Sequence, residues 1–337
     1  MAGMRDSHYI YAVSRIRTIE NSLLGQSGME RLIDTQNPEQ AMKLLKEAGY
    51  GHPSTETPAP AGYEKLLREE HKKLFVLLYE IFPESGIIDI FQQPYDFHNI
   101  KAILKAEFAR VEADSSVLSD KGSIPVEKLK AILRDRQFGD LPASVAEAAV
   151  EALADLNHTR DPQTADLILD RACYRRMRDM ADDTGSRFLT GFIAGSIDLL
   201  NMQIFIRLKN LGKGREFMER TILPGGYIKT ELFLDITKDP INKLKEVLWD
   251  TPYRDSASRV VKRYETYGRK AFLEKLSDGF ILAHILIGRQ KISGLEPLIG
   301  YMLNRESELR NVRTVLSGKM NGVSPEKIRE RLRAVYV

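Results

Sequence analysis

The chain contains almost no cysteine: Cys173 is the only one among 337 residues. A single thiol cannot form an intramolecular disulfide, and it cannot supply a cysteine-cluster metal site. This usage is typical of an intracellular, reducing compartment. Because Cys173 lies on the apolar face of a predicted helix, we expect a buried structural thiol rather than a reactive one.

Long apolar runs are also missing. The most apolar stretch, residues 188–200, is interrupted by Thr190, Ser196 and Asp198, and no run approaches the ~20 residues that a membrane-spanning helix needs. Residues 1–17 have no long apolar core, so we expect no secretory signal. If the protein works at a membrane, the sequence predicts that it does so through another protein.

Neither sign of charge dominates the composition. Lys and Arg number 50 against 47 Asp and Glu, a net charge of +3, which is far from the basic balance of a dedicated nucleic-acid binder. Basic residues do cluster at 171–178, 262–270 and 329–333. A solvated helix face is our first interpretation of these clusters, docking to an acidic protein surface the second, and nucleic-acid binding the third.

Motifs for catalysis or cofactor binding are absent as well. No two of the six histidines stand at metal-ligand spacing on one predicted helix. The sequence has no phosphate-cradling glycine loop and no dinucleotide fingerprint. Adjacent acids such as Asp182 and Asp183 lie beside a predicted helix end and do not make a general acid–base pair. We therefore predict no catalytic residues, no cofactor and no metal.

Helical periodicity is present nearly everywhere. Apolar residues recur at intervals of three and four over residues 63–81, 165–181 and 265–290, which predicts three long amphipathic helices. No sustained alternating run is bounded by hairpin signals, so few or no strands are expected. The predicted fold class is all-α.

A short signature occurs three times, about a hundred residues apart. Each copy reads acid, two residues, Asn, aliphatic and then a long polar side chain, as in residues 96–101, 198–203 and 308–313. A signature repeated at such a period indicates related structural units. The residues singled out from it are Asp96, Asn99, Lys101, Asp198, Asn201, Arg207, Glu308, Asn311 and Arg313.

Other segments repeat around the signature. Residues 35–38 (Thr-Gln-Asn-Pro) resemble residues 237–240 (Thr-Lys-Asp-Pro), and the helix predicted after each Pro closes near a tyrosine, Tyr50 or Tyr253. Asn or Asp before Pro is typical of a helix start. These similarities predict three helical units, at residues 1–120, 121–223 and 224–337, in a pseudo-threefold arrangement.

The signature has two interpretations. On a helix, the acid and the Asn are three residues apart and share a face, and Asn inside a helix is a poor helix former that needs a definite partner. In the first interpretation, both side chains cap or bridge the turn that enters the signature helix. In the second, the three helices line a shared central surface and meet a partner there. The two interpretations are compatible with each other.

The order and spacing of several motifs resemble one known family: the C subunit of prokaryotic V-type (A/V-type) ATPases, which is related to the d subunit of the eukaryotic vacuolar ATPase. The likeness covers nearly the whole chain. The third copy departs from the other two, with Glu308 in place of Asp and Ser317 in place of Lys105 or Arg207. The motifs that carry the resemblance are residues 11–17, 95–105, 197–207, 223–226, 297–301 and 306–316.

This resemblance implies an all-helical, funnel-shaped structural component without an active site or cofactor. In the family it sits between the central shaft, made of the D and F subunits, and the rotor ring of proteolipid subunits. It would lie on the cytoplasmic side, touch the membrane only through the ring, and transmit torque between ATP chemistry and proton or sodium transport. The alternatives are a helical scaffold of another assembly and a nucleic-acid-binding helical protein.

Overall fold

The computed structural model describes residues 2–52, 59–82, 84, 86–239, 243–249, 251, 253 and 269–333. Every regular element in these ranges is a helix, which confirms the predicted all-α class. The chain divides into two compact units. Unit 1 comprises residues 1–85 and 278–337, and unit 2 comprises residues 86–277.

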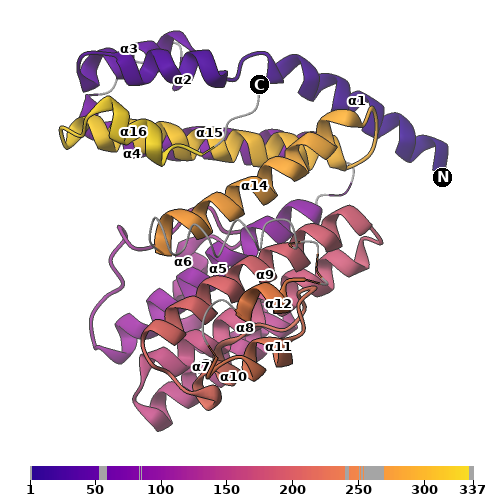
Figure 1. Cartoon of the computed structure of the whole chain (residues 1–337), viewed down its shortest axis with the longest axis vertical. Helices are drawn as coiled ribbons and strands as arrows, with labels where there is room; N and C mark the ends of the chain where they lie inside the picture. The colour runs from indigo at the N-terminus through magenta and orange to yellow at the C-terminus, as the bar shows by residue number, and fades with distance from the viewer. Residues whose placement is uncertain are drawn as a thin grey trace. The chain divides into compact units, whose positions relative to one another are not determined.

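Unit 1 combines helices from both ends of the chain. Its centre is α15 (Glu296–Met320), which packs against every other long helix of the N-terminal part (Figure 1). The 3-10 helix η1 (Pro60–Gly62) leads into α4. The helices that contact α15 are α1 (Ala2–Glu20), α2 (Gly25–Asp34), α3 (Pro38–Glu47), α4 (Tyr63–Ile81) and α16 (Pro325–Arg331).

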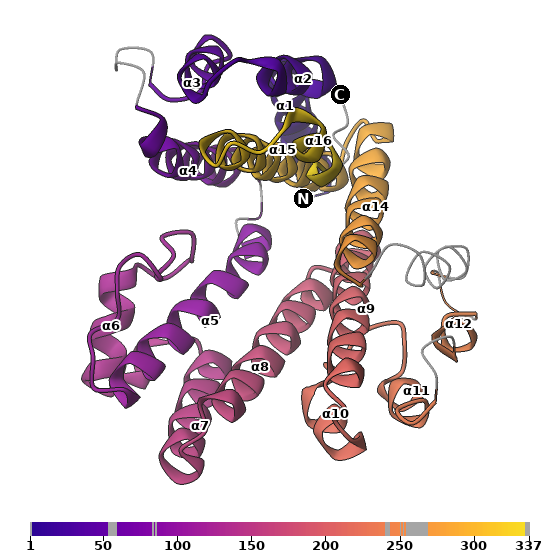
Figure 2. The same ribbon diagram turned by 60° about the vertical axis from the view of Figure 1, so that its left-hand side comes forward.

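Unit 2 is built around long packed helices. Helix α8 (Pro162–Asp183) packs on α5 (Gly86–Phe108), on α7 (Ala143–Thr159) and on α9 (Arg187–Asn210), as Figure 2 shows. Helix α14 (Arg269–Gln290) begins in unit 2 and ends in unit 1. The shorter elements of unit 2 are α6 (Val126–Arg134), η2 (Phe138–Asp140), α10 (Arg215–Thr221), α11 (Thr230–Asp235) and α12 (Leu244–Val247).

Several helices begin where the sequence places a capping side chain. Asn37 accepts a hydrogen bond from the Gln40 amide at 2.9 Å, with Pro38 in the first helical turn, as predicted. Asp161 caps α8 and Ser186 caps α9 in the same manner. The matching segment at residues 237–240 cannot be compared in full, because Pro240 lies outside the described residues.

Helices α5, α9 and α15 end in the same backbone conformation. Arg110, Gly212 and Gly322 each stand fourteen residues after the signature acid and have φ of 57°, 66° and 64°. In each case the next amide donates to the carbonyl five residues earlier, at 2.9, 3.0 and 2.9 Å. These are three Schellman caps in one register, so the repeat extends from the signature to the end of its helix.

The core of unit 1 joins the N-terminal helices to α15. Leu32 and Leu45 are fully buried, and they belong to one cluster with Val312, Val315 and Ile328. Each fully buried aliphatic side chain contributes about 1.5–3 kcal/mol to folding. The apolar faces of α2 and α3 are therefore buried against residues that lie almost 300 positions later in the chain.

The predicted boundaries agree with the structure to different degrees. The helix predicted at 63–81 has the bounds of α4, and the one predicted at 165–181 lies within α8. The helix predicted at 265–290 corresponds to α14, and its residues 265–268 lie outside the described part. The three units at 1–120, 121–223 and 224–337 and their pseudo-threefold arrangement remain predictions.

Candidate functional site: the three signature clamps

The signature residues lie in the middle of α5, α9 and α15, not at the helix entries that our first interpretation assumed. The three acids and the three asparagines are all buried, each no more than 1% exposed. Buried polar groups of this kind must find partners inside the protein. Their partners are in the segments that follow each helix, and in unit 1 also in the N-terminal segment.

The side chain of each signature asparagine forms two hydrogen bonds to the backbone of one later residue. Its Oδ1 accepts the amide hydrogen and its Nδ2 donates to the carbonyl of the same residue. Asn99 binds Ser119 at 2.8 and 2.7 Å, and Asn201 binds Leu223 at 2.8 and 2.7 Å. Asn311 binds Arg333 at 2.9 and 3.0 Å. A side-chain amide is suited to this role because it carries one acceptor and two donors.

The first two acids hold a second point of the same segment. Asp96 accepts the amides of Ser123 and Ile124 at 3.1 and 3.0 Å, and also the Ser123 hydroxyl at 2.6 Å. Asp198 accepts the amides of Tyr227 and Ile228 at 2.9 and 3.0 Å. Both segments lead into a short helix, α6 or α11. Acid and asparagine together therefore fix the path by which the chain enters that helix. We call each signature acid with its asparagine a signature clamp: Asp96 with Asn99, Asp198 with Asn201, and Glu308 with Asn311.

Glycine is required where these carboxylates approach the backbone. A Cβ on Gly122 would collide with Asp96 Oδ1, and a Cβ on Gly226 would collide with Asp198 Oδ1. The two glycines occupy matching places in two turns of similar sequence, although no local pattern relates either turn to its acid. The signal was present as Gly-Ser-Ile at 122–124 and Gly-Tyr-Ile at 226–228.

The third acid holds residues near the start of the chain. Glu308 Oε2 accepts the Leu24 amide at 2.8 Å, and Oε1 accepts the Tyr50 hydroxyl at 2.7 Å. The tyrosine that matches Tyr50 is Tyr253, whose hydroxyl donates to the carbonyl of Gly195, three residues before Asp198, at 3.4 Å. The third signature is thus completed by the N-terminal segment.

A cation accompanies the third acid. Arg305 pairs with Glu308 and with Glu70 Oε2 at 2.6 Å, and its guanidinium lies 4.6 Å from the centre of the Tyr50 ring. All of these side chains are at most 12% exposed. Lys73 extends the network by contacting Glu70 at 2.7 Å. Pairing and hydrogen bonding are what allow charges to remain this deeply buried.

Burial also raises the pKa of the first two acids. It raises the pKa of Asp198 to about 6, although the amides of Tyr227 and Ile228 act in the opposite direction. The pKa of Asp96 is raised for the same reason, against the effect of its bonds to Ser123. In unit 1, burial raises the pKa of the Tyr50 hydroxyl well above its usual range.

The long polar residue of the signature points to a neighbouring long helix. Lys101 of α5 pairs with Asp170 of α8. Arg313 of α15 pairs with Glu64 of α4 at 2.9 Å. In the second copy the residue at this position is Gln203, whose Nε2 donates to the Ser277 hydroxyl of α14 at 3.4 Å. The polar residue therefore joins each signature helix to another long helix of the same unit.

Arg207, which we singled out in the second copy, has a different position. It is four residues beyond Gln203, is exposed, and has no side-chain partner in the described part of the chain. Its counterpart in the first copy, Lys105, pairs with Asp166 of α8. The structure therefore brings eight of the nine predicted residues into bonded sites and leaves Arg207 at the surface.

One repeated residue escaped the sequence comparison. Lys209 and Lys319 both stand eleven residues after the acid and donate to carbonyls at the end of a short helix. Lys209 contacts the Thr237 carbonyl at 2.8 Å, and Lys319 contacts the Ile33 carbonyl at 2.7 Å. The first copy has Glu107 there, which pairs with Arg136. Comparing the second and third copies alone would have found this lysine.

The comparison with known proteins gives one family. The family model described as ATP synthase (C/AC39) subunit matches residues 12–331. The chain belongs to this family. It is 25% identical to the C subunit of the A-type ATP synthase of Methanocaldococcus jannaschii, over 96% of this chain and 86% of that protein. It is 27% identical to the C subunit of the V-type sodium ATPase of Enterococcus hirae, over 95% and 97%.

As a member of the ATP synthase (C/AC39) family, the chain is a structural component of a rotary ATPase complex, as the sequence resemblance implied. A third relative, the C subunit of the A-type ATP synthase of Halorubrum lacusprofundi, is 23% identical over 98% of this chain and 99% of that protein. The family match at residues 12–331 spans all three signature copies.

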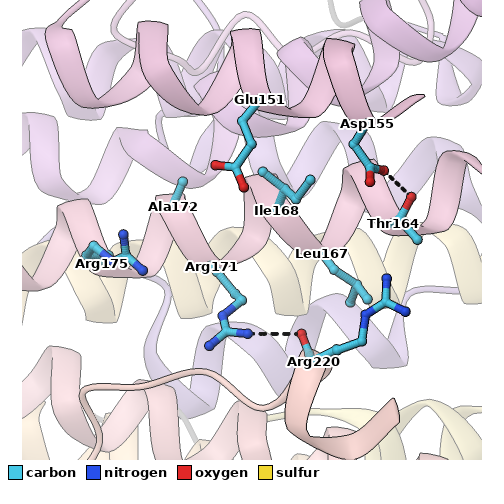
Figure 3. A pocket seen from close by; sticks show the side chains of 9 residues that line it. All are labelled: Glu151, Asp155, Thr164, Leu167, Ile168, Arg171, Ala172, Arg175 and Arg220. Carbon is cyan, nitrogen blue, oxygen red and sulfur yellow. Dashed lines mark hydrogen bonds between the residues drawn. The ribbon is translucent and has the colours of Figure 1, made fainter. Parts of the chain in front are cut away.

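This family member has a cleft in unit 2, between α7, α8 and α10 (Figure 3). Its volume is about 280 Å³, and its lining carries both signs of charge. Glu151 and Asp155 form one wall, and Asp155 accepts the Thr164 hydroxyl. Arg171 reaches across to the Arg220 carbonyl at 3.4 Å. The cleft is therefore part of the basic cluster that the sequence shows at 171–178.

Two further findings concern chemistry and membranes. In the described residues, no group of three or more His, Cys, Asp or Glu side chains could hold a metal ion. Cys173 is buried, and burial raises the pKa of its thiol. Helix α9 is long and apolar enough to cross a membrane, but 67% of that stretch is buried within the protein and it carries the clamp residues Asp198 and Asn201.

Proposed function

We propose that this protein is the central-stalk adaptor of its rotary ATPase. In this proposal it joins the shaft of the D and F subunits to the rotor ring of proteolipid subunits. It transmits torque between ATP hydrolysis or synthesis and proton or sodium transport, and has no active site of its own. The observation that carries the proposal is the match of nearly the entire chain to the C subunits of A-type and V-type enzymes.

The clamps support this role physically. A part that transmits torque must resist bending, and close-packed helices with few voids are stiff. The first two signature helices are each fixed to the next segment by hydrogen bonds of the acid and the asparagine, such as those of Asn201 and Asp198 with residues 223–228. The third is fixed to Arg333 by Asn311 and to the N-terminal segment by Glu308. Buried bonds of this kind break together rather than singly, because every freed group would be left without a partner.

The proposed position in the complex rests on the same family match. The protein would lie on the cytoplasmic side, peripheral to the membrane, and reach the lipid only through the ring. The three repeats would surround a common axis, which is the predicted pseudo-threefold arrangement. Docking to an acidic partner surface would use the arginines of the cleft, Arg171, Arg175 and Arg220, which lie opposite its acidic wall (Figure 3). Nucleic acid is not among the proposed partners.

Affinity purification tests the proposal against its rivals. A tagged form of the full chain should recover both the ring proteolipid and the D and F shaft subunits from detergent-solubilised membranes. A helical scaffold of another assembly would consistently recover neither. A nucleic-acid-binding protein would instead retain DNA or RNA in a manner that weakens steeply with salt.

A further inference from the structure

The acid of the third clamp binds residues far away in the sequence, whereas its asparagine and both residues of the other two clamps bind locally. Asn201 and Asp198 hold residues 22 to 30 positions away. Glu308 holds Tyr50 and Leu24, which are 258 and 284 positions away. We call residues 24–50, which contain α2 and α3, the N-terminal strap. No short connection joins this strap to the signature helix that binds it.

The strap reproduces several contacts of the segment that follows α9, although the asparagine of the third copy binds Arg333 and not a residue of the strap. Its Thr35 hydroxyl donates to the Leu32 carbonyl at 2.8 Å, as the Thr237 hydroxyl donates to the Leu234 carbonyl at 2.8 Å. The strap thus provides for Glu308 the partners that the segment after α9 provides for Asp198. Further matched pairs are Lys319 with Lys209 and Tyr50 with Tyr253, each bonded to the corresponding part of its own repeat.

The strap differs from the segment after α9 in the charged side chains that hold it in place. Arg305 stands three residues before Glu308, where the other copies have Gln93 and Gly195. Only the third copy therefore places a buried cation at this position beside its acid, and Glu70 holds the far side of that cation. A second set of ion pairs ties the strap to α16, from Arg329 to Glu30 and Asp34.

We propose that the N-terminal strap is a latch that opens from α15 and α16 while the rest of the protein stays folded, and that the Glu308–Arg305–Tyr50 cluster is its lock. The proposal rests on the connectivity and on the placement of charge. The segment after α9 directly follows its signature helix in the chain, whereas the chain joins the strap to α1 and α4, which themselves pack on α15. The buried ion pairs add to the hold that these flanking helices provide.

Opening of the latch has a defined structural consequence. The buried side chains of α2 and α3 contact α4, α15 and α16, all within unit 1. Their departure would uncover an apolar face of α15 that includes Val312, Val315 and Leu316. A local opening of this size is a sub-global event, which hydrogen exchange resolves from global unfolding.

Hydrogen exchange followed by mass spectrometry tests the latch in the full chain. Tyr50→Phe removes the hydroxyl that donates to Glu308 and keeps the ring beside Arg305. We expect amides of residues 24–50 to exchange about tenfold faster in this variant, equivalent to losing about 1.4 kcal/mol of protection, and amides of residues 223–253 to be unchanged. Arg329→Gln, at the solvent side of the strap, should act in the same direction with a smaller effect.

Tyr253→Phe is the matched control, because it removes the equivalent hydroxyl from the segment after α9. It should accelerate exchange in residues 223–253 and leave the strap unchanged. The latch is contradicted if Tyr50→Phe and Tyr253→Phe accelerate both segments by the same factor. It is equally contradicted if the wild-type strap exchanges only through the opening that also exposes the amides of α4 and α15, the helices of unit 1 that should stay folded.

Discussion

At the residue scale, one asparagine in each repeat makes two hydrogen bonds to a single backbone position. Asn201 is fully buried, and so are both groups that it binds on Leu223. Asn201→Ala should reduce the free energy of unfolding by about 2–4 kcal/mol, because it leaves a buried amide and a buried carbonyl without partners. Urea unfolding measures this loss. Asn157→Ala, on the exposed face of α7, should be neutral or slightly stabilising.

The loss at Asn99 should be smaller than at Asn201. Its partner Ser119 is only partly buried, so water can replace the lost bonds. Equal losses for Asn99→Ala and Asn201→Ala would contradict the importance of burial in the clamps. A loss below about 0.5 kcal/mol for Asn201→Ala, the lower end of what one hydrogen bond contributes, would show that the clamp contributes little to stability.

Asp198 should give the protein a measurable pH dependence. Its pKa is about 6 in the folded protein and ~3.9 in an unfolded chain. The folded state therefore binds the proton more tightly, and the free energy of unfolding rises as pH falls from 7.5 through 6. By pH 5 this gain should be about 1 kcal/mol relative to Asp198→Asn, which has no titrating group. Identical pH profiles for the two proteins, from urea unfolding at each pH, would contradict the shift.

At the element scale, the three signature helices share their C-terminal caps but not the residue at the left-handed position. Gly212 suits φ of 66°, whereas Arg110 has a side chain at φ of 57°. Gly212→Ala should cost about 1 kcal/mol, and Arg110→Gly should gain about 0.5–1 kcal/mol. Thermal unfolding would detect both as shifts of opposite sign, and shifts of the same sign would argue against the shared cap.

The elements were largely predictable from the sequence, because local signals dominate their formation. The apolar period at 63–81 predicted the bounds of α4, and Asn37 before Pro38 predicted the start of α3. The partner of the signature was not predictable in the same way. Nothing in the local pattern indicates that Asp198 binds amides 29 and 30 residues later. That contact depends on Gly226, whose role is visible only when the turn lies against the carboxylate.

At the scale of the whole molecule, the repeat in the sequence and the compact units differ in their boundaries. The repeat pattern follows the order of the chain, so it joins residues 1–120 into a first unit. The packing instead joins α2 and α3 to α15 and α16, because the third signature acid binds the N-terminal strap. The last copy of the repeat thus packs against the first segment of the chain, a match that Tyr50 and Tyr253 already indicated in the sequence.

The role as a coupling component is tested most directly by transport per ATP. The complex is reconstituted into vesicles from purified shaft, ring and remaining subunits, with and without this chain. Ion uptake and ATP hydrolysis are then measured in the same sample. We expect ATP-driven uptake only when the chain is present, and hydrolysis without uptake when it is omitted. The same uptake per ATP in its absence would show that coupling does not pass through this protein.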